Sequence, residues 1–326
     1  MKNTNMLIGV CALLAGLSGQ ALAQAAYPNQ PIRFVVTTAA GGGLDNFGRL
    51  VAKELTPRAG QQVIVDNRPG AGTTIGSTAV ARARPDGYTV LVNTSALAIS
   101  PAMYAKLPYD TIADLMPITL GAAAPNMLVV HPSLPVKSIR ELIALAKARS
   151  AKGDALMYAS GGTGTNGHLA TALFLSMAQI QMTHVAYKSG APAVIDVIAG
   201  QVLLMLDTVS SVMPQVNAGK LRAIGVSGAS RSLAAPSIPT IAESGVPGYA
   251  SGQWYGLLVP TGTPQEIIAW LHRETTTLLR SPGVKERLTA EGLEVVASSP
   301  EEFAALIKAD IAKWTKLVKT IDLPLL

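Results

Sequence analysis

The sequence contains little cysteine, few aromatic residues and few charges. Its 326 residues include one cysteine, Cys11, while aromatic residues make up 5% and charged residues 14% of the chain. Cys11 lies in a segment that we expect to be removed, so no disulfide stabilises the rest. A hydrophobic core must therefore provide the stability. A chain of this length can bury such a core and favours two domains.

Long apolar runs are also missing beyond the N-terminal segment. The run from Met6 to Leu17 is shorter than the about 20 residues that span a bilayer, and Gly, Pro or charge interrupts every later run. Lys2 before this run and small residues after it are typical of a secretory signal. We expect a signal peptide over residues 1–25, cleaved near Ala23 to Ala25. A lipid anchor on Cys11 is disfavoured because apolar residues continue past it.

The signatures of several function classes are absent. The net charge is +6, but no block of five like charges points to nucleic acid, so the basic excess favours anionic small molecules and solubility. The four histidines show neither H-E-x-x-H nor a nearby cysteine, and no G-x-S-x-G elbow is present. We therefore predict no catalytic residue, no metal and no cofactor, and we do not expect an enzyme.

The chain does contain an alternation of β-rich apolar runs with helical patterns. Ser138, Thr263 and Ser299 are each followed three residues later by Glu, which is typical of a helix start. An apolar stripe from Phe303 to Ile321 predicts the buried face of a last helix. Strands alternating with helices indicate an α/β architecture. The predicted strands are 32–38, 62–67, 88–94, 126–132, 156–160, 182–187, 202–207, 221–227, 254–260 and 293–297.

Two stretches share a strand, a glycine-rich loop and a helix start. They are "VVTTAAGGGLDNFGR" (35–49) and "YASGGTGTNGHLATALF" (158–174). A helix N-terminus offers unpaired N–H groups and partial positive charge, which suit an anion. If the two loops belong to different domains and face each other, they could hold one carboxylate from both sides. The alternative is that both are ordinary tight turns.

The second stretch also contains G-x-G-x-x-G, the dinucleotide fingerprint, at Gly162, Gly164 and Gly167. That fingerprint requires an acidic residue about 20 positions further on to bind the ribose. Tyr187 and Lys188 occupy that place, and the first acidic residue after the loop is Asp196. The sequence therefore does not predict a nucleotide site.

Segments along nearly the whole chain resemble one family, the Bug (TctC-like) receptors of tripartite tricarboxylate transporters. In order, they are "YPNQPIRFVV", "AGGGLD", "DNRPGAGTTIG", "PDGYTVLV", "LPYD", "ASGGTGTNGHL", "HVAYKSGAPA", "AGQV", "AGKLRAIGVS", "PTIAESGVPG" and "SPEEFAALI". The resemblance implies a type II periplasmic-binding-protein fold with two α/β domains, a hinge and a ligand cleft between them. It also implies a small carboxylate ligand, a periplasmic location and membrane permease subunits as partners.

On this basis we expect domain 1 at 27–124 plus 250–326 and domain 2 at 125–249, in a monomer. A receptor that presents its ligand to a membrane sensor is the alternative function. Which carboxylate is bound does not follow from the sequence, because a site built from backbone donors reads charge and position. The expected ligand-binding residues are Thr38, Ala40, Gly41, Gly42, Asp45, Thr94, Ser95, Ser160, Gly162, Gly164, Thr165, Asn166, His168 and Asp207.

Individual side chains in this set have two interpretations. Asp45 either stabilises the N-terminus of its helix or binds a ligand ammonium group. Asp207 ends an apolar strand, and the resemblance makes it a candidate for contact with ligand, directly or through water, whereas His168 could hold its own loop. His184 is expected in the core or on a domain face. Thr37-Thr38 replaces the proline and aromatic residue common in the family, which makes this wall of the pocket more polar.

Overall fold

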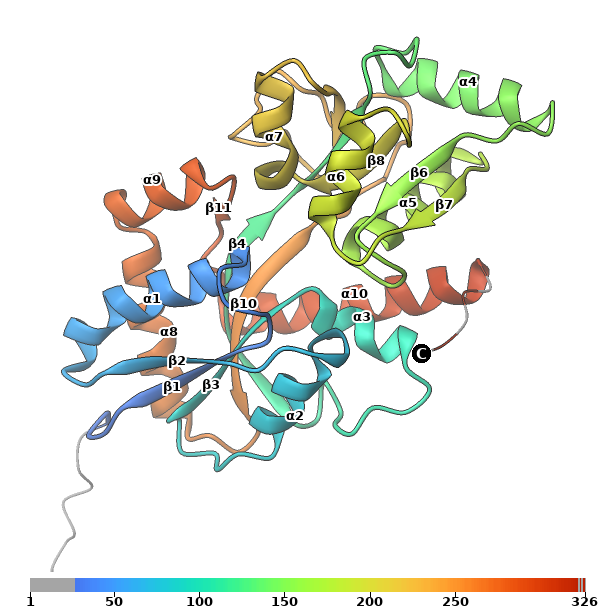
Figure 1. Ribbon diagram of the computed structural model, residues 1–326. Coiled ribbons are helices and arrows are strands. Elements are labelled where there is room, and N and C mark those ends of the chain that lie inside the picture. Colours follow the sequence, from blue (N-terminus) through green and yellow to red (C-terminus); the bar gives the residue numbers. More distant parts are fainter. Residues whose placement is uncertain (1–26, 322, 324, 326) are drawn as a thin grey trace, which may run out of the picture.

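A computed structural model describes residues 27–321, 323 and 325 of the chain (Figure 1). The predicted signal peptide lies outside these residues. The described chain forms two lobes, each built on its own β-sheet with helices on both faces (Figure 1). In this part of the chain, no helix has both the length and the apolar character needed to cross a membrane.

The first lobe contains a six-stranded sheet in the order β11-β4-β10-β3-β1-β2. Three strands are parallel, whereas β10 runs antiparallel to its neighbours on both sides. Both alternating faces of the central strands are buried, as expected when helices cover a sheet on two sides. The strands are β1 (Ile32–Val36), β2 (Val63–Asn67), β3 (Thr89–Thr94), β4 (Leu115–Ala124), β10 (Gln253–Pro260) and β11 (Glu294–Val295).

Seven helical segments belong to this lobe: α1 (Gly43–Ala59), η1 (Ala71–Thr73), α2 (Thr74–Ala81), α3 (Ala96–Met103), α8 (Gln265–Leu279), α9 (Pro282–Ala290) and α10 (Pro300–Thr320). The predicted start of α10 is confirmed, since the Ser299 hydroxyl accepts from Glu302 N–H and Glu302 accepts from Ser299 N–H. Phe303 and Trp314 of its apolar stripe are fully buried. The Thr263 hydroxyl instead donates to the carbonyl of Pro260, so α8 begins without a side-chain cap.

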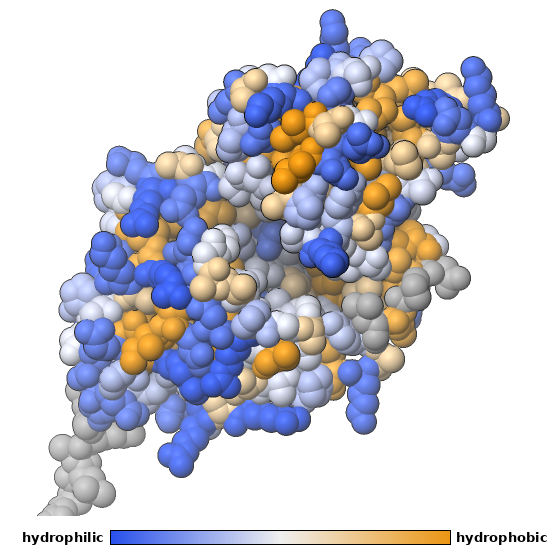
Figure 2. Space-filling model, in the orientation of Figure 1, coloured by the Kyte–Doolittle hydropathy of each residue, from blue (hydrophilic) through white to orange (hydrophobic). Residues whose placement is uncertain are grey.

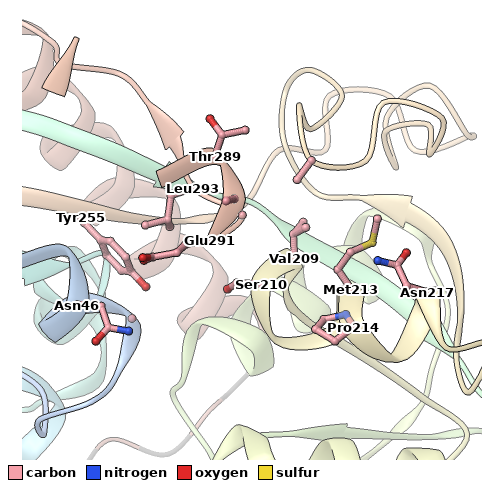
Figure 3. Close-up of a pocket in the computed structure, with 14 residues that line it drawn as sticks. Asn46, Val209, Ser210, Met213, Pro214, Asn217, Tyr255, Thr289, Glu291 and Leu293 are labelled. Carbon is pink, nitrogen blue, oxygen red and sulfur yellow. The ribbon is translucent and has the colours of Figure 1, made fainter. Parts of the chain in front are cut away.

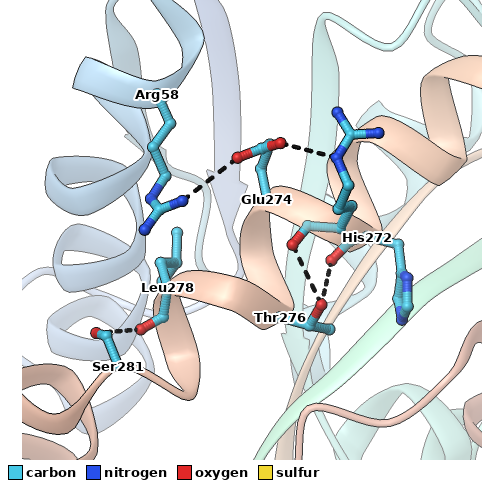
Figure 4. A network of polar contacts seen from close by, with 7 residues as sticks. Arg58, His272, Glu274, Thr276, Leu278 and Ser281 are labelled. Atoms are coloured by element: carbon cyan, nitrogen blue, oxygen red, sulfur yellow. Dashed lines mark hydrogen bonds and ion pairs between the residues drawn. The ribbon is translucent and has the colours of Figure 1, made fainter.

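Helices α1 and α8 pack together on one face of the first sheet. Arg58 near the end of α1 reaches Glu274 of α8 at 3.5 Å, and Arg273 also pairs with this carboxylate at 3.0 Å (Figure 4). Exposed ion pairs of this kind contribute about 0–1 kcal/mol. The buried contacts beneath them, including Phe47, Leu55 and Leu271, therefore provide most of the stability of this face.

The second lobe contains a five-stranded sheet in the order β7-β6-β8-β5-β9. Its strands are β5 (Asn126–Val130), β6 (Met157–Ser160), β7 (Thr183–Ala186), β8 (Leu204–Thr208) and β9 (Arg222–Val226). Its helices are α4 (Ile139–Ser150), α5 (Asn166–Ala178), α6 (Gly190–Ile198) and α7 (Val209–Asn217). The predicted cap of α4 is confirmed, because the Ser138 hydroxyl accepts from Glu141 N–H.

The chain passes between the lobes twice, from β4 to β5 and from β9 to β10 (Figure 1). Strands β4 and β10 pair from Leu115 opposite Pro260 to Ala124 opposite Gln253, so the two crossings leave the first sheet side by side. This two-lobed α/β architecture is the predicted fold class. The exact domain bounds given above stay a prediction.

An apolar cluster joins the lobes on one side of the crossings. Ile99 and Met103 of α3 pack with Leu169 and Ala172 of α5, and Trp314 of α10 completes the cluster. All five residues are buried. The start of α5 is therefore held against the first lobe, which places the loop before α5 at the boundary between the lobes.

Candidate functional site

The boundary between the lobes contains a cavity of about 580 Å³, here called the cleft cavity. The space-filling view shows the molecule hollowed between its lobes (Figure 2). The volume lies within the range of about 300–1,000 Å³ typical of small-molecule sites. Both lobes and the strand β10 contribute to its wall, through segments that begin at Thr38, Gly72, Thr94, Gly161, Lys188, Leu206 and Gln253.

Four helices begin at this cavity, two from each lobe. Their N-cap residues, which all line it, are Thr73 of α2, Ser95 of α3, Thr165 of α5 and Ser189 of α6. The Thr165 hydroxyl accepts from His168 N–H, but the other three N-cap side chains make no capping bond. Helix N-termini that converge on one cavity, with N-cap hydroxyl groups that make no capping bond, favour the binding of an anion.

Two buried hydroxyl groups at this cavity have no hydrogen-bond partner within the described residues. They belong to Thr38, which follows β1, and to Thr73. Thr73 also has φ +81°, which a β-branched residue rarely adopts, and Gly72 before it has φ +58°. Unsatisfied buried polar groups and strained backbone both concentrate at functional sites. This corner of the cavity therefore has the properties of a binding surface.

The loop before α5, residues 161–165, is here called the second glycine loop. Gly162 and Gly164 have φ values of +129° and +77°, so both positions need glycine's conformational freedom. The Thr165 hydroxyl donates to the carbonyl of Gly162 at 2.7 Å, and Gly164 N–H donates to His168 Nδ1 at 3.1 Å. The expected contact between His168 and its own loop is thus present.

Asn166, the first residue of α5, bridges the two lobes. Its Nδ2 donates to the carbonyl of Gly252 at 3.1 Å and lies 3.4 Å from Ser95 Oγ, while its Oδ1 accepts from Asn126 Nδ2 at 2.6 Å. The amide therefore fixes the start of α5 relative to α3 and to the crossing that leads into β10.

Charge in the cleft cavity comes from two side chains. Lys188, before α6, is the only cationic residue in its wall within the described chain. Burial raises the pKa of the Asp207 carboxyl, although bonds from Thr208 N–H and the Ser211 hydroxyl act in the opposite direction. Asp207 at the end of β8 therefore takes up a proton more readily than an exposed carboxyl group does.

The first glycine loop lies elsewhere, contrary to the expectation that both loops face one cavity. Ala40, Gly41 and Gly42 are not part of the wall of the cleft cavity. The reason lies in Asp45, which is 1% exposed and whose carboxylate accepts from Gly41 N–H at 2.8 Å and Arg49 Nε at 2.9 Å. This carboxylate holds the loop against its own helix.

The bonds of Asp45 decide between its two interpretations in favour of helix stabilisation. Burial alone would raise its pKa, but bonds from Arg49, Gly41 and Asn67 lower the pKa below its usual range. The carboxylate is therefore charged and fully engaged by protein groups at the start of α1. The first lobe contributes Gly72, Thr73 and Ser95 to the cleft cavity in place of the glycine loop.

A second cavity, of about 530 Å³, lies between α1, α7 and the end of α9 (Figure 3). We call it the α1–α7 cavity. Tyr255 and Glu291 lie together on its first-lobe side, and Met213 and Asn217 of α7 face them (Figure 3). Burial, with the charges of Asp207 and Glu291, raises the pKa of Tyr255 to about 12.

Helices α1 and α7 also begin at the α1–α7 cavity, and neither has a side-chain capping bond. Asp45 places a buried carboxylate in the first turn of α1, and Gly292 lies so close to the start of α7 that a β-carbon there would be 3.0 Å from Ser210 N. The carboxylate of Glu291 adds negative charge to the wall. This cavity therefore does not favour an anion, although its volume matches that of the cleft cavity.

The predicted site residues separate into three groups. Those in the wall of the cleft cavity are Thr38, Thr94, Ser95, Gly164, Thr165, Asn166 and Asp207. Ser160 and His168 lie behind the second glycine loop and support it, and Gly162 belongs to that loop without lining the cavity. Ala40, Gly41, Gly42 and Asp45 belong to the first glycine loop. Their contact with a ligand stays a prediction.

Several residues of the cavity wall were not predicted from the sequence. The polar ones include Thr73, Ser100, Lys188, Ser189 and Gln253, and the apolar ones include Ile99 and Met103. A signal was available for part of this set, because "HVAYKSGAPA" also reads as a strand, a short polar loop and a helix start. Within the described residues, no group of three or more His, Cys, Asp or Glu side chains could hold a metal ion.

The chain matches a known protein family and is similar to several solved structures. Residues 47–323 match the family described as "Tripartite tricarboxylate transporter family receptor". Protein BugT of Bordetella pertussis is 33% identical over 323 residues, covering 98% of both chains. The structure of Rpa4515 of R. palustris with adipate has a TM-score of 0.79 at 34% identity, over 92% of this chain and 100% of that one. MatC of Rhodopseudomonas palustris with bound malate has a TM-score of 0.75 at 30% identity, over 90% and 100%.

Proposed function

Since the chain belongs to the tripartite tricarboxylate transporter receptor family, we propose that it is a periplasmic receptor that binds a small organic carboxylate and delivers it to the membrane permease subunits of such a transporter. The observation that carries the proposal is the convergence of four helix N-termini on the cleft cavity, three of them with N-cap side chains that make no capping bond. Bonds from neutral donors to a charged group contribute about 1.5–3 kcal/mol each. Four such bonds suffice for micromolar affinity, which corresponds to about 8 kcal/mol.

The wall of the cavity also suggests how the ligand lies. A carboxylate would lie at the starts of α5 and α6, where Ser189 provides a donor and Lys188 positive charge. Ile99 and Met103 of α3 form an apolar part of the wall. This arrangement suits an acid with a hydrocarbon body. Rpa4515 and MatC, crystallised with adipate and malate, support a dicarboxylate.

The remaining predicted site residues have supporting roles in this proposal. Thr38, Thr94 and Ser95 would bind polar ligand atoms from the first lobe, and Asp207 would contact the ligand through water or in its protonated form. Closing of domain 1 (27–124 and 250–326) on domain 2 (125–249) would exclude solvent. Solution scattering with and without ligand tests closure. A radius of gyration that does not change at saturating ligand would contradict closure.

A thermal-shift screen of the mature chain over dicarboxylates, tricarboxylates, acidic amino acids and aromatic acids tests the ligand class. A ligand at 100 times its Kd stabilises the folded state by about 2.7 kcal/mol. Matched amides, which lack the charge, serve as controls. Stabilisation by amides and carboxylates alike would contradict an anion site. Recovery of a chemically altered ligand would show that the protein is an enzyme and would contradict the receptor function.

The proposed location has its own test. The family is one of periplasmic binding proteins, and we propose that export removes a signal peptide near Ala23 to Ala25. Mass spectrometry of the protein from a periplasmic extract should give an N-terminus within these residues. An intact Met1 in that extract would contradict the proposed cleavage.

A further inference from the structure

Three aromatic rings stack behind the second glycine loop. His184 lies in the middle, with its ring centroid 4.0 Å from that of His168 and 4.9 Å from that of Tyr158, and the planes are inclined by 14° and 21°. Tyr158 and His184 are register partners on β6 and β7, and His168 lies in the first turn of α5. Three elements of the second lobe thus meet directly behind the loop.

Each histidine holds this part of the chain through its own bond. His168 Nδ1 accepts from Gly164 N–H at 3.1 Å. His184 Nε2 lies 2.6 Å from Ser160 Oγ, and this oxygen accepts from Gly162 N–H at 3.1 Å. The positive φ angles of both glycines are therefore each fixed by a bond that leads back to an imidazole ring.

We propose that His168 and His184 are positioning residues that together hold the second glycine loop in its ligand-binding shape, and that acid releases the loop by protonating this stack. The inference rests on the proposed binding of a carboxylate by that loop. In the observed bond, Nδ1 of His168 carries no proton. Protonation turns this acceptor into a donor that faces Gly164 N–H, so the bond is lost.

The surroundings of the stack keep both rings neutral near pH 7. Burial lowers the pKa of His168 to about 4, with the charge of His184 acting in the same direction, and burial also lowers the pKa of His184. Tyr158 from β6 is itself neutral, because burial raises its pKa to about 12. Helix α5 and strand β7 carry no further titratable side chain.

The charged groups on the cavity side are Lys188 and Asp207, and neither changes the pKa of His168 or His184. No ion pair joins a carboxylate to either ring within the described residues. A charged stack would therefore lack a counter-ion, and a proton on one ring opposes a proton on the other.

The first experiment needs no ligand. The chain contains four histidines, so NMR titration can follow His168 and His184 individually. We expect both stacked rings to titrate below the ordinary histidine pKa of about 6.5. We also expect exchange of the Gly162 and Gly164 amides, corrected for its intrinsic pH dependence, to accelerate at least about tenfold through that titration. The proposal would be overturned if His168 titrated near pH 6.5. It would also be overturned if the exchange rates of the Gly162 and Gly164 amides did not change as His168 and His184 titrate.

The second experiment measures the affinity for adipate by calorimetry between pH 7 and pH 4, the range that reaches the lowered pKa of His168. His168→Leu removes the acceptor and should weaken binding at pH 7 about fivefold or more. His168→Asn keeps an acceptor oxygen that does not titrate, so its affinity at pH 7 should stay near that of the parent and fall less in acid. Because acid also protonates adipate and Asp207, this variant is the reference for both effects. His131→Asn is the control for a distant histidine.

Two outcomes of the binding experiment would overturn the proposal. One is a folded His168→Leu protein with the affinity of the parent. The other is a His168→Asn protein that loses affinity in acid as steeply as the parent. If His168→Leu does not fold, His184→Gln replaces it with the same expectation. A parent that binds no carboxylate would refute the proposed function, while the NMR experiment would still decide the role of the stack.

Discussion

The cleft cavity and the α1–α7 cavity are similar in volume and differ in the charge and packing around their helix starts. At the cleft cavity, the side chains of Thr73, Ser95 and Ser189 make no capping bond, and Lys188 adds positive charge. At the α1–α7 cavity, Asp45 lies in the first turn of α1, Glu291 adds negative charge and Gly292 packs against the start of α7. A helix N-terminus therefore favours an anion only where nearby carboxylates and closely packed chain do not oppose it. Volume alone does not distinguish the two.

The largest effect should come from the glycines of the two loops. Gly164 has φ +77° and a β-carbon there would lie 3.1 Å from Met103 Cε, whereas Gly42 has φ −82° and its nearest neighbour would be 3.6 Å away. We expect Gly164→Ala to abolish detectable binding of the best screened carboxylate in calorimetry, and Gly42→Ala to bind like the parent. Circular dichroism checks that both fold. Equal losses of affinity in both variants would mean that both glycine loops bind the carboxylate, as the sequence predicts.

Removal of the N-cap hydroxyl groups that make no capping bond should have the next largest effect on affinity. Thr73→Val and Ser95→Ala each remove one donor from the cleft cavity, and each should weaken binding by about 1.5 kcal/mol, or roughly tenfold. Ser210→Ala, at the covered start of α7, is the matched control and should have no effect. A loss for Ser210→Ala as large as for Thr73→Val would mean that the ligand occupies the α1–α7 cavity.

Neutralising one charged side chain at each cavity should have a smaller effect on binding. Lys188 is exposed at the cleft cavity, so Lys188→Gln should weaken carboxylate binding by up to about 1 kcal/mol, with a loss that shrinks as salt is added. Glu291→Gln in the α1–α7 cavity should leave the affinity unchanged and lower the pKa of Tyr255, which ultraviolet titration of the tyrosines can detect. An affinity that rises with Glu291→Gln would show that this carboxylate also faces the ligand.

The smallest effects should come from two aspartates with opposite shifts. Asp45 has a lowered pKa, so its stabilising bonds are present at neutral pH and are lost as pH falls through that pKa. Asp45→Asn should cost about 1 kcal/mol at pH 7 and less in acid. Asp207 has a raised pKa, so the folded state gains stability as pH falls through that pKa.

Asp207→Asn should therefore remove the acid-side gain and improve carboxylate binding at pH 7 about twofold, because a like charge is removed. Thermal melting from pH 4 to pH 7 and calorimetry at pH 7 measure both variants. A pH profile for Asp207→Asn that is parallel to that of the parent would assign the raised pKa to a group outside the cleft.

Most strands could be predicted because their apolar runs are continuous. Strand β4 was missed, since Pro117, Gly121 and the alanines after it disguise a long buried strand that pairs with β10. The site was predicted in part for a related reason. Helix starts are readable locally, which identified the loop that contains Thr165, but which starts meet depends on the strand order β3-β1-β2, and no local pattern encodes that order.

The first glycine loop shows the limit of motif reading most clearly. Its glycines and Asp45 are the same residue types that an anion site uses, and only the structure shows that Gly41 N–H already donates to the carboxylate of Asp45. Thr73 was overlooked for the opposite reason. Its strained φ of +81° and its unpartnered hydroxyl become visible only in three dimensions.

The apolar cluster of α3, α5 and α10 has a consequence for how long a ligand stays bound. If the proposed opening moves α5 away from the first lobe, it would separate Leu169 and Ala172 from Ile99, Met103 and Trp314 and break the bond from Asn166 to Gly252. These contacts belong to the protein and are the same for every ligand. Dissociation rates should therefore share an upper limit, because no ligand could leave faster than these contacts break.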